Sequence, residues 1–240
     1  MTEDSRSLLA LQDLDTAIDR DRHRRANLPE LAEVAAVDQK IAEMRAEANE
    51  AVAARDAVAR RQADVEAELA TAEERAAAVN RRLYSGEVTA SRELQAMAAD
   101  ADSLTARASH LEDEVLEILD EREPLDRRVA DLAAGVAGLA GRRDEAAGVL
   151  VAAQGDVDRE LAELVGRRDA AAAAVSPGLL ATYEQLRSRL GGVAVARLVG
   201  DHCDGCHLSL PATELDRIRH LPPGEVATCE QCGRILVRPS

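Results

Sequence analysis

The sequence predicts a mainly α-helical protein in which a long antiparallel coiled-coil hairpin precedes a small C-terminal α+β module. Apolar residues repeat at heptad spacing over most of the first 175 residues, which is typical of a coiled coil. Ala, Glu, Arg and Leu dominate, and the chain has two Tyr but no Phe or Trp, so a thick globular core is not expected. The four cysteines form two Cys-x-x-Cys pairs near the C-terminus, so the module is predicted to be a zinc ribbon.

The first domain, residues 1–175, is predicted to hold the hairpin, with its tip near residues 84–90. An apolar seam runs from Val37 to Leu83 in alternating steps of four and three residues, which predicts the first long helix. The stretch before Pro29 is expected to form a separate helix or a kinked extension, because proline is favoured in the first turn of a helix.

The seam resumes at Leu94 and continues to Val157, which predicts the second long helix. A short turn between two matched heptad runs favours antiparallel packing, and in that register Arg55 faces Arg122. Two guanidinium groups in one layer need carboxylates nearby. The candidates are Asp56, Glu121, Glu123 and Asp126. Pro124 is expected to interrupt this helix, because it lacks the amide hydrogen and clashes with the preceding turn.

The turn between the arms is built around Gly86, which can adopt the left-handed conformation that a tight turn needs. Thr89 or Ser91 can then cap the second helix, since a hydroxyl can accept a hydrogen bond from the first free amides.

The second domain is predicted to span residues 176–240, because the Ala-rich heptads end there. A connecting helix is expected to begin at Ser176, followed by proline at its first position, and to end at the glycines 191–192. A short helix is expected over 213–219, capped by Thr213 and ended by the Leu-Pro-Pro-Gly sequence at 221–224.

The cysteine pairs carry the strongest chemical signal in the chain. They consist of Cys203 with Cys206 and Cys229 with Cys232. Each pair can place two sulfurs about 2.3 Å from one ion, and two pairs complete a tetrahedron. Four thiolates leave no position for water, so one structural zinc ion is predicted rather than a catalytic one.

Two other uses of the cysteines remain alternatives. Iron–sulfur ligation needs four thiolates as well, but more often uses other spacings. A thioredoxin-like redox site would need a surrounding βαβ pattern, which the sequence lacks. No catalytic constellation is found, so the protein is predicted not to be an enzyme and to have no small-molecule substrate.

The net charge of −15 argues against a protein that coats duplex nucleic acid, since phosphate binding needs clustered Lys and Arg. From Ser176 onward, seven Arg balance seven acidic residues, so only this part is a candidate for nucleic acid. The candidate contacts are Arg197, Arg217, Arg219, Arg234 and Arg238. Scattered, solvated arginines are the simpler interpretation. An acidic start without a long apolar run predicts a cytoplasmic protein with no membrane association.

The tip from Leu83 to Gln95 and the ribbon from Cys203 to Leu236 together resemble a bacterial family of coiled-coil hairpins with a C-terminal C4-type zinc ribbon. That family includes zinc-ribbon adaptor proteins associated with flagella and with the sigma-54 class of sigma factor. This chain departs from the family's tip pattern, in which a proline follows a capping residue: Ala90 and Ser91 stand there, so Thr89 is expected to take over the cap.

The resemblance implies a non-enzymatic adaptor that binds a protein partner, linked to transcription or secretion machinery. Its candidate partner-binding residues at the tip are Tyr84, Gly86, Val88 and Gln95. Two alternatives stay open. One is the binding of RNA or single-stranded DNA by the zinc ribbon, and the other is a redox-sensing chaperone that releases zinc on oxidation.

Overall fold

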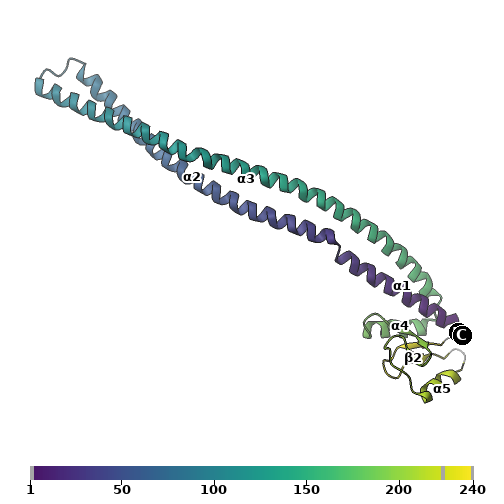
Figure 1. Cartoon of the computed structure of the whole chain (residues 1–240). Coiled ribbons are helices and arrows are strands. Elements are labelled where there is room, and N and C mark those ends of the chain that lie inside the picture. Colours follow the sequence, from purple (N-terminus) through teal and green to yellow (C-terminus); the bar gives the residue numbers. More distant parts are fainter. Residues whose placement is uncertain (1–2, 223–224, 239–240) are drawn as a thin grey trace. The chain divides into compact units, whose positions relative to one another are not determined.

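The computed structural model describes residues 3–222 and 225–238 and shows, within them, five helices and four short strands (Figure 1). This is the predicted fold class: a long helical hairpin and a small strand-containing ribbon. The chain packs as two compact units, Val34–Glu145 and Met1–Glu33 together with Ala146–Ser240. Within the described residues, no helix combines the length and the apolar character needed to cross a membrane.

Two long helices, α2 (Pro29–Leu83) and α3 (Ser91–Ala173), form the arms of the hairpin (Figure 1). In the ion pairs that join α2 to α3, the residue number on α3 rises as the residue number on α2 falls. The two arms are therefore antiparallel in the first unit. The ion pairs between the arms in this unit are Arg82–Glu93 (3.5 Å), Glu68–Arg107 (2.9 Å), Arg61–Glu121 (2.5 Å) and Asp38–Arg143 (3.3 Å).

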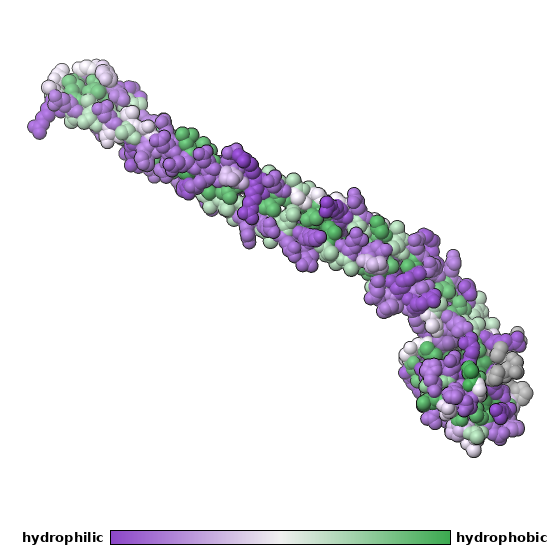
Figure 2. Space-filling view, viewed as in Figure 1, coloured by the Kyte–Doolittle hydropathy of each residue, from purple (hydrophilic) through white to green (hydrophobic). Residues whose placement is uncertain are grey.

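The core of the hairpin follows the heptad seam. Val65 and Ala72 of α2 are buried together with Leu111 and Ile118 of α3, and all four are seam positions. The alanine lets the helices approach closely, while the branched side chains fill the space between them. Hydrophilic side chains cover much of the visible outer face, with smaller apolar areas between them (Figure 2).

Arg55 and Arg122, which the heptad register predicts to face each other, each bind other side chains. Arg122 Nη1 donates to Gln62 Oε1 at 2.9 Å, one heptad away from Arg55. The carboxylate of Asp126 lies 3.2 Å from Arg122 Nε, and Arg55 contacts its neighbour Asp56 at 2.6 Å. Two of the four expected carboxylates therefore neutralise the arginines, but through each arginine's own helix.

The prediction that Pro124 interrupts the second helix is wrong, because α3 continues through it. The lost amide hydrogen affects one bond in a helix of 83 residues, and packing along the seam holds the turns on both sides. Two i,i+4 ion pairs also bracket the proline, Arg122–Asp126 and Glu123–Arg127, and such pairs each add about 0.3–0.5 kcal/mol to helix stability.

At the tip, Gly86 has a φ of 79°, which confirms the expected left-handed turn. The cap differs from the prediction. The amides of residues 93 and 94 both donate to the carbonyl of Ala90 at 3.0 Å, so Ala90 occupies the N-cap position. Thr89 precedes that position and Ser91 is already the first helical residue, so neither hydroxyl stands where a capping side chain must be.

The second unit contains α1 (Glu3–Ala26), α4 (Pro177–Arg189), α5 (Ala212–His220) and a four-stranded sheet. The helix α1 ends before Pro29 begins α2. The N-terminal stretch is therefore a separate helix and not a kinked extension, which confirms one of the two predicted alternatives. The predicted cap of α5 is wrong, because the helix begins before Thr213 and Pro211 occupies the N-cap position. The helix ends at His220, directly before the predicted stop at Leu221, and of that stop Pro223 and Gly224 lie outside the described residues.

The sheet has the order β2-β1-β4-β3, with β1 and β4 parallel and the two outer pairs antiparallel. The parallel central pair joins strands that are far apart in sequence, with the zinc-ribbon segment between them. The strands are β1 (Val195–Val199), β2 (His202–Cys203), β3 (Ala227–Thr228) and β4 (Ile235–Val237).

The largest core of this unit lies where α1, the end of α3 and α4 meet the central strands. Tyr183 is fully buried there, and Leu8 and Leu11 of α1 pack with Val195 and Val237 of the sheet. The N-terminal helix therefore supplies apolar surface that the short ribbon strands cannot supply themselves.

The connecting helix α4 ends as predicted. Gly191 and Gly192 have φ values of 70° and 100°, and the amide of Gly192 donates to Arg187 O at 2.9 Å, which is the long hydrogen bond of a Schellman motif. Ser176 occupies the N-cap position, although its side chain makes no capping hydrogen bond.

Candidate metal centre

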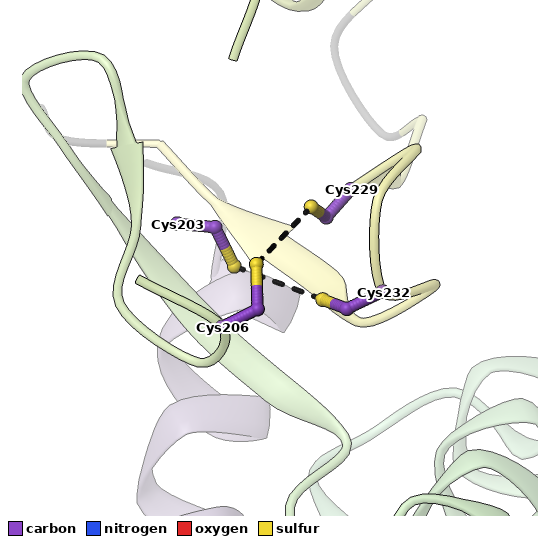
Figure 3. A group of neighbouring side chains, drawn as sticks. All are labelled: Cys203, Cys206, Cys229 and Cys232. Carbon is purple, nitrogen blue, oxygen red and sulfur yellow. Dashed lines mark hydrogen bonds between the residues drawn. The ribbon is translucent and has the colours of Figure 1, made fainter. Parts of the chain in front are cut away.

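The sulfur atoms of the four cysteines point toward one another from two turns of the ribbon (Figure 3). All four lie within 4.8 Å of one another. Cys203 Sγ is 3.9 Å from Cys232 Sγ, and Cys206 Sγ is 3.9 Å from Cys229 Sγ. Each close pair joins the two turns, so the centre ties the segment after β1 to the segment before β4.

The two turns have the same backbone hydrogen bonds. In the first, His207 N donates to Cys203 O at 2.7 Å and Cys203 N donates to Leu208 O at 3.1 Å. In the second, Gly233 N donates to Cys229 O at 2.7 Å and Cys229 N donates to residue 234 O at 2.9 Å. Both turns thus fold the two cysteines of a pair to the same side.

The fifth residue of each turn is left-handed. Gly233 has a φ of 73° and His207 a φ of 58°. His207 is the one non-glycine residue with positive φ in the described part of the chain. It occupies the backbone position that glycine takes in the second pair.

Gly205 is needed for a different reason, because the first turn packs tightly against its surroundings. A Cβ at this position would lie 2.9 Å from Ala196 Cβ and 2.6 Å from Arg234 Cδ. Arg234 is held across the turn by a 3.0 Å hydrogen bond from its Nε to Val193 O. The two turns are therefore joined by packing as well as by the sulfurs.

The short helix α5 supports the second turn. Glu214 is buried, and its Oε1 accepts a 3.0 Å hydrogen bond from the amide of Glu230, between the two cysteines of the second pair. The side chain of Arg217, one turn later on α5, lies 3.4 Å from the Glu230 carboxylate. Sequence reasoning missed Glu214, and a short helix with an acidic first turn was the one signal available.

The thiols differ in how readily they lose a proton. Burial raises the pKa of the Cys203 thiol to about 12 and also raises the pKa of Cys229. Burial acts in the same direction on Cys232, but hydrogen bonds from Arg234 and the neighbouring thiols outweigh it and lower the pKa of Cys232 to about 7. A metal ion binds thiolates, so it must displace protons from the buried thiols.

The cage fits a zinc ion. Four sulfurs in a tetrahedron about 2.3 Å from zinc lie about 3.8 Å from one another, close to the 3.9 Å of both short Sγ–Sγ distances. An all-thiolate donor set suits zinc, and it fills the coordination shell of a structural site.

Comparison with known proteins identifies both parts of the chain. The family model of the CT398-like coiled coil hairpin domain matches residues 11–191. The chain belongs to the CT398-like coiled-coil hairpin family. A model of the C4-type zinc ribbon domain matches residues 202–236, which include all four cysteines. This member of the CT398-like family therefore binds one structural zinc ion through the four-cysteine ribbon.

Relatives of this CT398-like chain extend over nearly its whole length. The proteins Rv2229c and MT2288 from two strains of Mycobacterium tuberculosis are each 33% identical over 246 residues, covering 97% of this chain and 94% of the relative. A solved structure from Mycobacterium smegmatis has 26% identity and a TM-score of 0.72, covering 98% of this chain and 97% of that one. CT398 from Chlamydia trachomatis shares the fold, with a TM-score of 0.72, 17% identity and the same coverage.

The predicted tip residues of this CT398-like hairpin lie together at the end of the arms. Tyr84 is 83% exposed, Gly86 and Gln95 are exposed, and Val88 is half-buried. An aromatic side chain that is exposed to this degree makes few contacts with the rest of the hairpin. Tyr84 therefore contributes little to the stability of the hairpin core.

The five predicted arginines do not form one face. Arg217 and Arg219 lie on α5, where Arg217 is paired with Glu230. Arg234 is half-buried in the metal centre. Arg197 and Arg238 alone meet at a common groove, together with Arg6 of α1, a residue that the sequence analysis did not single out because it lies at the opposite end of the chain.

Proposed function

We propose that the protein is a non-enzymatic, zinc-stabilised adaptor that binds a protein partner. The observation that carries this proposal is the closed cage of four thiolates. A zinc ion with four thiolate ligands has no open position for water or substrate, so it stabilises the fold of the ribbon and its surface and does not form an active site. The same inference disfavours an enzyme. The descriptions of the family and of the solved relatives name no enzymatic activity.

The hairpin tip is the favoured docking surface of the adaptor. Tyr84 has the largest exposed fraction among the large apolar and aromatic side chains that the structure describes. Tyrosine is enriched among residues that dominate binding energy at protein interfaces. Val88 and Gln95 beside it supply an apolar and a hydrogen-bonding contact. Partners in transcription or secretion machinery belong to this proposal through the family resemblance alone.

A crosslinking pull-down with the full-length, zinc-loaded chain tests the proposal. The variant Tyr84→Ala should reduce recovery of the partner at least about tenfold if the tip carries a binding hot spot. The matched control is Leu116→Ala, which truncates a residue that is 60% exposed on α3; it should leave recovery unchanged. Equal recovery with both variants would argue against the tip. Absence of any partner above background would argue against the adaptor.

Nucleic-acid binding by the ribbon has weaker support. The five candidate arginines are divided between α5, the metal centre and the groove, so they form no single basic track for a phosphate backbone. A mobility-shift titration with single-stranded RNA at two salt concentrations tests it, because phosphate contacts must weaken as salt rises.

A further inference from the structure

A groove outside the metal centre lies in the second unit, between α1 and the ends of β1 and β4. Its volume is about 580 Å³, within the range of ligand pockets, which is roughly 300–1,000 Å³. It has room for a few side chains but not for a folded domain. Its apolar lining consists of Leu9, Ala10, Leu198, Val199 and Val237.

The apolar lining combines buried and exposed residues. Leu198 and Val237 are 8% and 3% exposed and form the floor, while Val199 at the end of β1 is 58% exposed. Leu8 and Leu11 on the inner face of α1 pack into the core, so the adjoining residues of α1 remain to line the groove. Exposed apolar surface beside a concavity is a common feature of binding sites.

The polar lining is basic. It consists of Arg6, Arg197 and Arg238 with one acidic residue, Asp13, so three positive charges and one negative charge give a local charge of +2. The whole chain has a net charge of −15. A basic rim in so acidic a chain favours an acidic ligand, since complementary charge both steers and selects a partner.

The arginines retain their charge for a ligand. Arg197 lies 3.4 Å from Asp13, with both side chains more than half exposed, and such surface pairs contribute at most about 1 kcal/mol. A ligand carboxylate can therefore replace Asp13. Arg238 donates to Ile218 O at 2.8 Å, a neutral partner that orients the guanidinium without neutralising it.

We propose that this groove binds an acidic peptide segment of the partner, with apolar side chains on the floor and carboxylates beside Arg6 and Arg197. The inference rests on the adaptor function proposed above and adds the surface and the chemistry of recognition. It assigns the groove a role separate from that of the tip.

The lining favours a peptide over single-stranded nucleic acid. Binding of nucleic-acid bases without sequence preference relies on aromatic side chains on which the bases stack. Among the described lining residues none is aromatic. Of the two tyrosines in the chain, Tyr183 is fully buried and Tyr84 lies at the hairpin tip. Aliphatic side chains at the groove instead suit leucine, isoleucine or valine of a peptide.

The test is a selection of short displayed peptides on the zinc-loaded full chain, followed by fluorescence anisotropy with the enriched peptide. The groove variant combines Arg6→Glu with Val199→Asp; both residues are exposed, so the fold should tolerate the changes. The matched control combines Arg219→Glu with Val226→Asp, the same changes at exposed residues outside the groove lining. Zinc content and helical circular dichroism verify that both variants fold.

The expected result is enrichment of peptides that combine Asp or Glu with aliphatic residues. Their affinity should fall at least about tenfold in the groove variant, stay unchanged in the control, and weaken between about 0.05 M and about 0.5 M salt. Enrichment of neutral or basic peptides, equal binding to both variants, or no enrichment would overturn the proposal.

Two further measurements test whether something other than a peptide occupies the groove. Single-stranded RNA that binds the wild type and is lost in the groove variant would assign the groove to nucleic acid. Self-association in sedimentation that only the groove variant abolishes would assign it to a second copy of the chain, and either outcome overturns the peptide proposal. A partner recovered in the pull-down while the selection fails would leave the adaptor function standing without the groove.

Discussion

The hydroxyl of Tyr183 donates a 2.7 Å hydrogen bond to Oδ2 of Asp15, across 168 positions of sequence. Both residues are buried. Burial and the Asp15 carboxylate raise the pKa of Tyr183, so the hydroxyl keeps its proton and remains a donor. The same carboxylate lies 3.2 Å from Arg168 and 3.5 Å from Arg187. One acidic residue of α1 thus holds the end of α3 and α4.

Substitution of Tyr183 by Phe should destabilise the second unit by about 1.5–3 kcal/mol, because it removes a buried hydrogen bond to a charged group. Asp15→Ala should cost more, since Tyr183 loses its acceptor and Arg168 and Arg187 each lose one of their carboxylate partners. Urea unfolding measures both. The control is Thr182→Ala, which removes an exposed hydroxyl that bonds its own helix and should change stability by less than about 0.5 kcal/mol. A Tyr183→Phe effect no larger than that would show that the contact does not stabilise the unit.

The second prediction concerns Gln12, which binds the strand region from α1. Its Oε1 accepts hydrogen bonds from Ala194 N at 2.7 Å and Val195 N at 3.2 Å, and its Nε2 donates to Gly192 O at 2.9 Å. Gln12→Ala should destabilise the unit by about 2–3 kcal/mol, because two buried amides lose their acceptor. Hydrogen exchange at Ala194 and Val195 should accelerate.

Gln12→Glu refines this test, since it keeps the acceptor and loses the donor to Gly192; it should fall between the wild type and Gln12→Ala. The control is Gln39→Ala, which removes an exposed contact with Glu43 and should leave exchange at Ala194 unchanged. Unchanged protection in Gln12→Ala would mean that α1 does not anchor the strand.

The third prediction concerns removal of the metal. Cys206→Ser should lose most of the zinc, because three thiolates no longer complete the tetrahedral shell. The ribbon should then unfold, while most of the helical circular dichroism remains, since the heptad core of the hairpin contains no ligand. A strong chelator should have the same effect. His202→Ala is the control and should keep about one zinc per chain, as expected for a ribbon with four cysteine ligands. Zinc loss in that variant would give the histidine a place in the ligand set.

The fourth prediction compares the two left-handed positions of the metal turns. Gly233→Ala should lower stability by about 1–2 kcal/mol, because a Cβ is strained at positive φ. No atom lies within 4 Å of that Cβ position, so the backbone alone is responsible. His207→Gly should raise stability by up to about 1 kcal/mol for the same reason, less the entropy that glycine loses on folding.

Competition for zinc with a chromophoric chelator measures both turn variants. Gly178→Ala provides the control, because its Cβ also meets open space and its φ is not positive; helix α4 should gain slightly from the alanine. If His207→Gly weakened zinc binding, the imidazole would have a role beyond its backbone position.

Much of the fold could be predicted because it depends on local spacing. Heptad steps between Val37 and Leu83 place apolar residues on one side of a helix whatever lies elsewhere in the chain. Two residues between paired cysteines determine how far apart the sulfurs can lie, and Gly86 has the one backbone type that turns at positive φ without strain. The antiparallel hairpin and the structural zinc ion follow from such patterns.

Local spacing does not predict which side chains of α2 and α3 contact each other across the seam. Heptads repeat, so partners one repeat away satisfy the pattern equally well, and long side chains extend over a turn or more. Arg122 consequently donates to Gln62, a partner that the heptad register did not single out. The continuity of α3 through Pro124 likewise depends on packing by the whole helix, which outweighs the local penalty of one residue.

The sequence by itself determined two helical arms, a left-handed tip and a four-thiolate ribbon, because each carries a local pattern: heptad spacing along each arm, Gly86 in the turn, and two residues between the cysteines of each pair. Only the tertiary structure decided what completes the ribbon: Gln12 on the backbone of β1, Asp15 on Tyr183, Glu214 on the second metal turn, and Arg6 beside Arg197 at the groove. These partners are separated by 16 positions for Glu214 and Glu230 and by as many as 191 for Arg6 and Arg197. The sequence spacing of a polar side chain does not predict a partner that is distant in the chain. Its hydrogen bonds form only when the chain has folded.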